Sequence, residues 1–180
     1  MAYVDQALGD FLDLVAEPTP APGGGTVAAV TASLAAGLVA MAGAENADDV
    51  AALRRRAAAL ADEDAAAYSA VVQARRAGVP VNDALMRATE VPLEIAATAA
   101  EIARCAAEVF LSGRLAVRGD VATALLLAEG ATRSAAFLVE VNVGEGGGSR
   151  DLVDRARAYI ATARAARELA GGRSPVPVEH

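Results

Sequence analysis

The chain has 180 residues, a formal net charge of −7 and an isoelectric point near 4.7, so it lacks the basic surface that binding to nucleic acid requires. Hydrophobic residues make up 54% of the sequence but aromatic residues only 3%, which predicts a core of Ala, Val and Leu. A single cysteine, and a single histidine at the C-terminus, exclude an internal disulfide and argue against a metal site.

This length is typical of one domain, and we predict a single helical domain over residues 1–170 with a disordered, proline-containing tail over 171–180. The chain opens without the basic stretch and cleavage site of a secretory signal, so we expect a cytoplasmic protein. Because small apolar side chains each bury little area, we also expect the chain to pool its apolar faces in a homodimer or a larger oligomer.

Residues 4–15 carry apolar side chains at helical spacing and predict a short amphipathic helix. The prolines within residues 17–22 then predict an extended segment without helix. Three glycines follow at 23–25, where a backbone or a ligand can approach closely. Free N–H groups at the start of the next helix predict a cradle for a polar ligand; alternatively, the glycines form only a tight turn for helix packing.

The stretch from Thr26 to Ala44 is apolar on all sides, as expected of a buried helix. It has nearly the length of a membrane span, but its many Ala, Gly, Thr and Ser residues favour a soluble protein. A long helix from about Asn46 to Ala77 follows. Asp64 lies in line with the core positions of that helix, where it is either a surface charge or a functional acid.

The next predicted helix runs from Asn82 or Asp83 to about Ser112, with Pro92 expected to kink or split it. A linker over 113–119 leads to Asp120 as an N-cap, and an apolar, alanine-rich helix follows over 121–143. A last amphipathic helix is predicted over 151–170. No strand pattern is present, so the sequence predicts an all-α bundle of about six helices, two of them buried and alanine-rich.

Three stretches in the same order resemble the cyclodeaminase/cyclohydrolase family: residues 20–29, residues 90–96, and residues 113–120 leading to Asn142. The acid and aromatic pair of Asp64 and Tyr68 also fits that family. The resemblance implies an all-helical homodimer that binds a folate without a metal or redox cofactor. The implied reactions are hydrolysis of 5,10-methenyltetrahydrofolate to 10-formyltetrahydrofolate, or cyclisation of 5-formiminotetrahydrofolate with release of ammonia.

The resemblance also implies a site. A carboxylate can activate water against the cationic methenyl carbon, and we assign that role first to Asp120 and second to Asp64. Arginine side chains suit the glutamate tail of a folate. The predicted substrate contacts are Pro22, Gly23, Gly24, Gly25, Thr26, Tyr68, Arg114, Arg118 and Asn142.

The chain departs from the family pattern at two places. Arg114, Ala116 and Gly119-Asp120 stand where the family has an asparagine-rich linker and a Ser-Asp pair, and Leu138 stands near a usual asparagine. These replacements support an alternative hypothesis, in which the chain keeps the fold, has lost catalysis and serves as a binding or assembly protein.

Overall fold

The computed structural model describes residues 2–112 and 115–171, so nearly all of the predicted tail lies outside the described residues. Over the described residues the chain is helical and contains no strand, which confirms the predicted all-α class. The elements are η1 (Tyr3–Asp5), α1 (Leu8–Ala16), α2 (Gly24–Met41), α3 (Ala47–Ala77), α4 (Asn82–Leu111), η2 (Leu115–Val117), α5 (Arg118–Gly144) and α6 (Arg150–Gly171).

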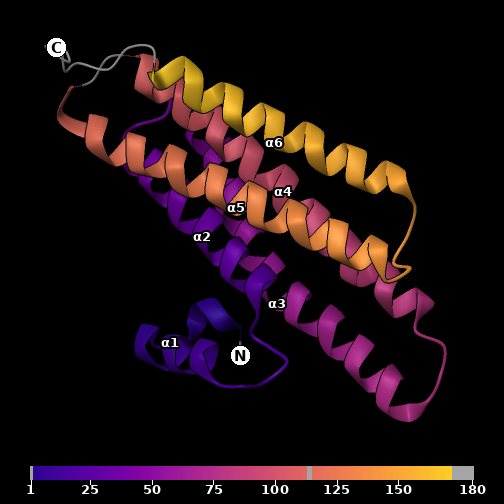
Figure 1. Cartoon of the computed structure of the whole chain (residues 1–180). Coiled ribbons are helices and arrows are strands. Elements are labelled where there is room, and N and C mark those ends of the chain that lie inside the picture. The colour runs from indigo at the N-terminus through magenta and orange to yellow at the C-terminus, as the bar shows by residue number, and fades with distance from the viewer. Residues whose placement is uncertain (1, 113–114, 172–180) are drawn as a thin grey trace, which may run out of the picture.

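Helices α2 to α6 run side by side along one long axis, and α1 lies apart from them to one side, linked by a loop to the start of α2 (Figure 1). Helix α4 contacts α2, α3, α5 and α6, so it is the central helix of the bundle. Alanine dominates the core, and Leu60, Ile95 and Ile102 are the largest fully buried side chains. Such small side chains let the helix backbones approach closely, as the composition predicts.

Two predicted boundaries differ from the structure. The helix predicted over residues 4–15 is divided into η1 and α1, with Gln6 in an extended conformation between them. Helix α5 begins at Arg118 instead of after Asp120, because η2 leads directly into it. The prediction of Asp120 as an N-cap is therefore wrong. Asp120 lies in the first turn of α5, where its negative charge interacts favourably with the positive end of the helix dipole.

Pro92 does not split α4, which is continuous over Asn82–Leu111. Proline has no N–H, so the carbonyl of Ala88, four residues earlier, lacks its helical partner. The side-chain amide of Asn142 on α5 donates a hydrogen bond to that carbonyl at 2.6 Å. A partner from a neighbouring helix therefore replaces the missing bond. Of the two outcomes predicted for Pro92, a kink or a split, the split is wrong.

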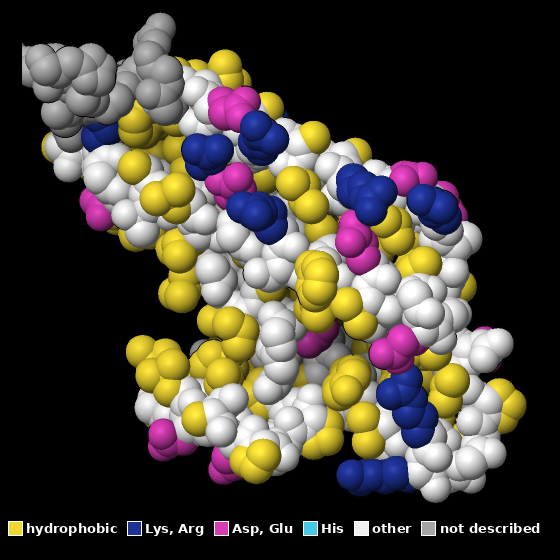
Figure 2. All heavy atoms as spheres, in the orientation of Figure 1, with side chains coloured by type: hydrophobic (Ala, Val, Ile, Leu, Met, Phe, Trp, Pro, Cys, Tyr) yellow, Lys and Arg dark blue, Asp and Glu magenta, His cyan; other side chains and the backbone are white. Residues whose placement is uncertain are grey.

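By length and composition alone, helices α2 and α5 are each apolar enough to cross a membrane. In each helix, 44% of the 18-residue apolar stretch is buried inside the structure. Core helices show the same properties, and each of the two packs against three other α-helices. Both keep large apolar side chains exposed, among them Leu34 at 61%, Leu126 at 62% and Phe137 at 64%. Figure 2 shows hydrophobic side chains along the hollow between the N-terminal segment and the bundle.

Candidate functional site

One face of α3 forms a wall of a cavity of about 340 Å³. Asp64, Tyr68, Val71 and Arg75 follow one another at spacings of four, three and four residues, which places them on one face of a helix. The turn at Gly23–Gly25, the first half of α4 and the end of α5 complete the cavity. Its other lining residues are Pro20, Ala21, Ala65, Leu85, Ala88, Pro92, Leu138, Val141, Asn142 and Glu145.

The Asp64 carboxylate packs directly against the backbone of Gly25 at the start of α2. A Cβ atom at position 25 would lie 2.0 Å from Asp64 Oδ1 and 2.5 Å from its Cγ, so only glycine leaves room for the carboxylate. The hydroxyl of Thr26, which is fully buried, donates a hydrogen bond to Asp64 Oδ2 at 3.0 Å. The glycine turn therefore positions the Asp64 carboxylate and also forms part of the cavity wall.

Burial raises the pKa of Asp64 above its ordinary value, because the charged carboxylate loses hydration. Hydrogen bonds from the hydroxyl and the backbone N–H of Thr26 oppose this rise by stabilising the charged form. The backbone amide predicted as part of a ligand cradle is thus bonded to an internal carboxylate. A carboxylate with a raised pKa, facing a cavity, is typical of a general base or acid.

At the other end of the cavity, an ion pair joins two helices. The guanidinium of Arg75 on α3 pairs with the carboxylate of Glu145, which follows α5 directly. Asn142 lies one turn before Glu145, and its side chain is held by the carbonyl of Ala88. The cavity therefore has a partly buried acid at one end and a paired cation at the other.

The structure brings together six of the predicted site residues around this cavity: Gly23, Gly24, Gly25, Asp64, Tyr68 and Asn142. Thr26 joins them through its bonds to Asp64, and Pro22 is buried beside the turn and lines a neighbouring groove.

Asp120 and Arg118 lie in the first turn of α5, whereas Asn142 lies near its end. Twenty-two residues of helix separate Asp120 from Asn142, or about 33 Å. The Arg118 guanidinium stacks over the Phe110 ring, 4.6 Å from its centre. The structure therefore does not bring these two residues to the Asp64 cavity within one chain, and Arg114 lies outside the described residues.

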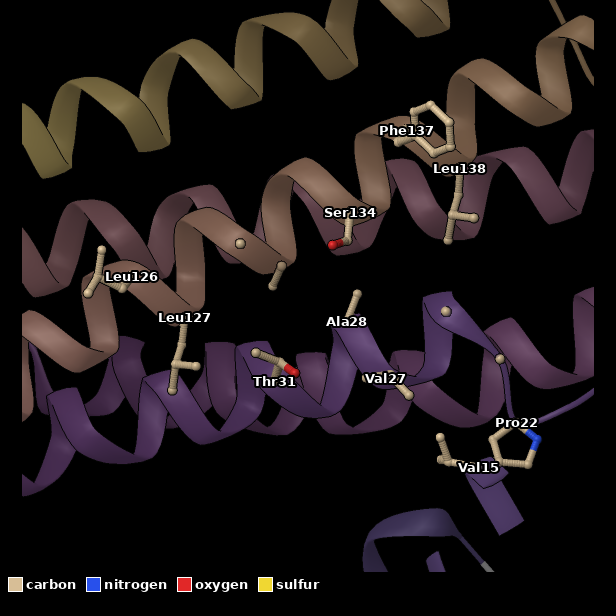
Figure 3. Close-up of a pocket in the computed structure, with 14 residues that line it drawn as sticks. Val15, Pro22, Val27, Ala28, Thr31, Leu126, Leu127, Ser134, Phe137 and Leu138 are labelled. Carbon is tan, nitrogen blue, oxygen red and sulfur yellow. The ribbon is translucent and has the colours of Figure 1, made fainter. Parts of the chain in front are cut away.

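A second hollow, an apolar groove of about 600 Å³, runs between α2 and α5 (Figure 3). Val27, Ala28 and Thr31 of α2 face Leu127, Ser134 and Leu138 of α5, and Val15 and Pro22 close one end. None of its lining residues is charged. Leu138, which the sequence singles out as a departure from the family pattern, lines both the groove and the Asp64 cavity.

Sequence reasoning missed Arg75 and Glu145. The face of α3 that carries Leu60, Asp64 and Val71 reaches Arg75 when the helical spacing is continued for one more turn. The helical spacing could therefore have predicted that Arg75 lies on the same face of the helix as Asp64. Nothing in the sequence indicates that Glu145 lies opposite, because that placement depends on how α3 and α5 cross.

Among the described residues, no group of three or more His, Cys, Asp or Glu side chains is placed to hold a metal ion. The polar groups that face the cavity are carboxylates, one guanidinium, one phenol and one amide. These groups suit proton transfer and the binding of an organic ion.

Comparisons with known proteins show the family and the fold of this chain. Residues 7–46 and 44–158 match the family described as formiminotransferase-cyclodeaminase. A methenyltetrahydrofolate cyclohydrolase from Methylorubrum extorquens is 32% identical over 167 residues, covering 77% of this chain and 79% of the relative. The crystal structure of formiminotetrahydrofolate cyclodeaminase from Thermotoga maritima has the same fold, with a TM-score of 0.86 at 21% identity over 94% of this chain and 96% of its own. The chain belongs to the formiminotransferase-cyclodeaminase family.

Proposed function

We propose that the protein is a folate one-carbon enzyme that hydrolyses 5,10-methenyltetrahydrofolate to 10-formyltetrahydrofolate, with Asp64 as the general base. The observation that carries this proposal is the Asp64 carboxylate, packed on Gly25 at one end of a cavity large enough for a ligand. Membership of a family whose relatives carry the names of tetrahydrofolate enzymes supplies the substrate class. Hydrolysis is preferred over deamination because the 32% identical relative is named a cyclohydrolase.

The proposed reaction uses water and groups of this chain. Water adds through its oxygen to the cationic methenyl carbon, and Asp64 takes one of the water protons. The bond from this carbon to N5 then breaks as N5 receives the proton from Asp64. The remaining hydroxyl proton leaves to solvent as the formyl C=O forms on N10. The negative charge of Asp64 also stabilises the cationic substrate beside it.

The test is an assay of the purified chain with two substrates. The decay of methenyltetrahydrofolate absorbance is expected to exceed the spontaneous rate in the same buffer and the rate with heat-denatured protein. Ammonia release from 5-formiminotetrahydrofolate is measured in parallel. If only the second reaction is accelerated, the enzyme is a cyclodeaminase, and if neither is accelerated the proposed function is wrong.

Thr26→Val is expected to move the acid limb of the kcat/KM profile to higher pH. The Thr26 hydroxyl stabilises the charged form of Asp64, so its loss raises the pKa of Asp64 further. The base is then protonated, and inactive, at a pH where it is still ionised in the natural protein. The measurement is kcat/KM against pH for both proteins.

The matched control for this prediction is Thr132→Val. Thr132 is also fully buried, but its hydroxyl bonds to the carbonyl of Ala128 within its own helix. Its replacement removes a hydroxyl of the same kind without touching the site. An unchanged profile for Thr26→Val, or equal shifts in both variants, would show that Asp64 is not the titrating base.

We further propose that the protein acts as a cytoplasmic homodimer without a metal or redox cofactor, and that the apolar faces of α2 and α5 form the dimer contact. Leu34, Leu126 and Phe137 are each more than 60% exposed in the single chain. Helix α2 carries no charged residue along its 18 positions. Large apolar side chains exposed on neighbouring helices are typical of contacts between protein chains.

Phe137→Glu is expected to weaken this dimer at least about tenfold, because each copy then places a charge in an apolar contact. Leu169→Glu is the control, since Leu169 on α6 has nearly the same exposure, 62% against 64%. Sedimentation of both variants and of the natural chain over a concentration series gives the dissociation constants. A natural chain that sediments as a monomer would contradict the dimer, and equal effects of both variants would contradict this surface.

A further inference from the structure

Arg75 is the one cationic side chain among the residues that line the Asp64 cavity in the described part of the chain. We infer that Arg75 binds the carboxylates of the substrate's glutamate tail, and that Glu145 occupies the Arg75 guanidinium until substrate arrives. This inference rests on the proposed function and names the part of the same cavity that selects the tail.

The spacing of Asp64 and Arg75 along α3 separates the two ends of the cavity by a length that suits a reduced folate. Arg75 follows Asp64 by eleven residues, three turns of helix and about 16 Å. A reduced folate carries its one-carbon unit beside the pterin ring and its carboxylates at the opposite end. When the one-carbon unit lies at Asp64, the tail is directed past Tyr68 and Val71 toward Arg75. The half-exposed ring of Tyr68 lies on that path.

The charges of the cavity match the charges of the substrate. Asp64 at one end suits the cationic methenyl group, and Arg75 at the other suits a carboxylate. Guanidinium groups bind carboxylates in a bidentate manner, which gives both affinity and orientation. A tail carboxylate cannot approach Arg75 favourably while Glu145 remains beside it, because the two carboxylates repel each other.

Exchange of Glu145 for the substrate carboxylate requires little rearrangement. The side chains of Arg75 and Glu145 keep 49% and 46% of their surface exposed, and an exposed ion pair contributes little to stability. The backbone N–H of Glu145 is bonded to the carbonyls of Val141 and Asn142. The Glu145 side chain can therefore turn toward solvent while the end of α5 stays in place.

This inference replaces an expectation drawn from the sequence. The family resemblance favours Arg114 or Arg118 as the partner of the tail. The Arg118 guanidinium stacks on Phe110 at the start of α5, and Arg114 lies outside the described residues. Arg75 lies on the same cavity wall as Asp64 and needs no second chain to reach it.

The experiment compares methenyltetrahydrofolate with methenyltetrahydropteroate, which has the same reacting ring but no glutamate. Arg75→Gln is expected to raise KM for the first substrate about 10- to 100-fold, with unchanged kcat and unchanged KM for the second. Glu145→Gln is expected to lower KM for the first substrate alone, because the competing carboxylate is gone. Arg76→Gln is the control, since Arg76 is the exposed neighbour that does not line the cavity.

Three outcomes would overturn the inference: equal effects of Arg75→Gln on both substrates, an effect of Arg76→Gln as large as that of Arg75→Gln, or a higher KM in Glu145→Gln. If the natural chain turns over neither substrate, the proposed function fails separately. Calorimetric binding of tetrahydrofolate and tetrahydropteroate then decides the role of Arg75. A preference for the glutamate form that Arg75→Gln abolishes supports it, and equal binding of both compounds overturns it.

Discussion

Asp64→Asn is expected to lower kcat/KM by about 10²- to 10⁴-fold, the usual contribution of a general base. Asparagine has nearly the same shape, so it fits beside Gly25 and its oxygen can still accept a hydrogen bond from Thr26. It cannot take a proton from water at neutral pH. Steady-state rates of methenyltetrahydrofolate hydrolysis, corrected for the spontaneous reaction, measure the loss.

The same variant is expected to be at least as stable as the natural chain at neutral pH. The pKa of Asp64 is higher in the folded chain than in the unfolded one. Ionisation of Asp64 therefore lowers the free energy of unfolding of the chain. The loss grows as the pH rises from the ordinary pKa of the carboxyl group through its raised pKa, and it persists at higher pH. Asparagine removes this cost, so the thermal midpoint should be equal or higher while activity falls. Loss of both activity and stability would instead indicate a structural role for Asp64.

Asp154→Asn is the matched control, because Asp154 is an exposed acid on α6 away from the cavity. Its rate should equal that of the natural chain. Asp120→Asn makes a second comparison, since Asp120 is the acid that the family resemblance ranked first. A single chain places Asp120 about 33 Å along α5 from Asn142, so its replacement should leave the rate intact. A large loss would show that a second chain brings Asp120 to the site.

The contrast between Asp64 and Asp120 shows what the sequence could and could not predict. Periodicity predicts each long helix, and the described α3 (Ala47–Ala77) and α4 (Asn82–Leu111) follow the predicted ranges closely. Periodicity also places Asp64 on the core side of its helix. It carries no information about which end of α5 meets α2, because that depends on the packing of residues far apart in the chain.

Pro92 illustrates the same limit. The local rule predicts a kink or a break, because proline removes a hydrogen bond within its own helix. The bond that compensates comes from Asn142, 54 residues away from Ala88. Only the tertiary structure reveals such a partner, and the same contact fixes Asn142 in the cavity wall. The family resemblance predicts Asn142 as a substrate contact, and that role stays a prediction; the structure shows its side-chain amide bonded to the carbonyl of Ala88.

Gly25→Ala is expected to lower kcat/KM about 100-fold or more and to cost about 1–3 kcal/mol of stability. The added methyl would lie 2.0 Å from Asp64 Oδ1, so the carboxylate must leave its bonds with Thr26 or the start of α2 must move. Either change misplaces the base. Gly37→Ala is the control, because a methyl there would meet nothing within 4 Å and Gly37, on the same helix, does not line the cavity.

A double-mutant cycle identifies the cause of that cost. The three heavy atoms nearest to the added methyl all belong to the Asp64 carboxyl group, so Asp64→Ala removes these three contacts. In the Asp64→Ala background, Gly25→Ala should therefore destabilise the chain much less than it does alone, giving a coupling free energy of about 1 kcal/mol or more. Chemical denaturation of the four proteins measures this coupling. Additive effects would mean that the carboxylate does not rest on Gly25, and the assignment of Asp64 as a base held by the glycine turn would lose its geometric support.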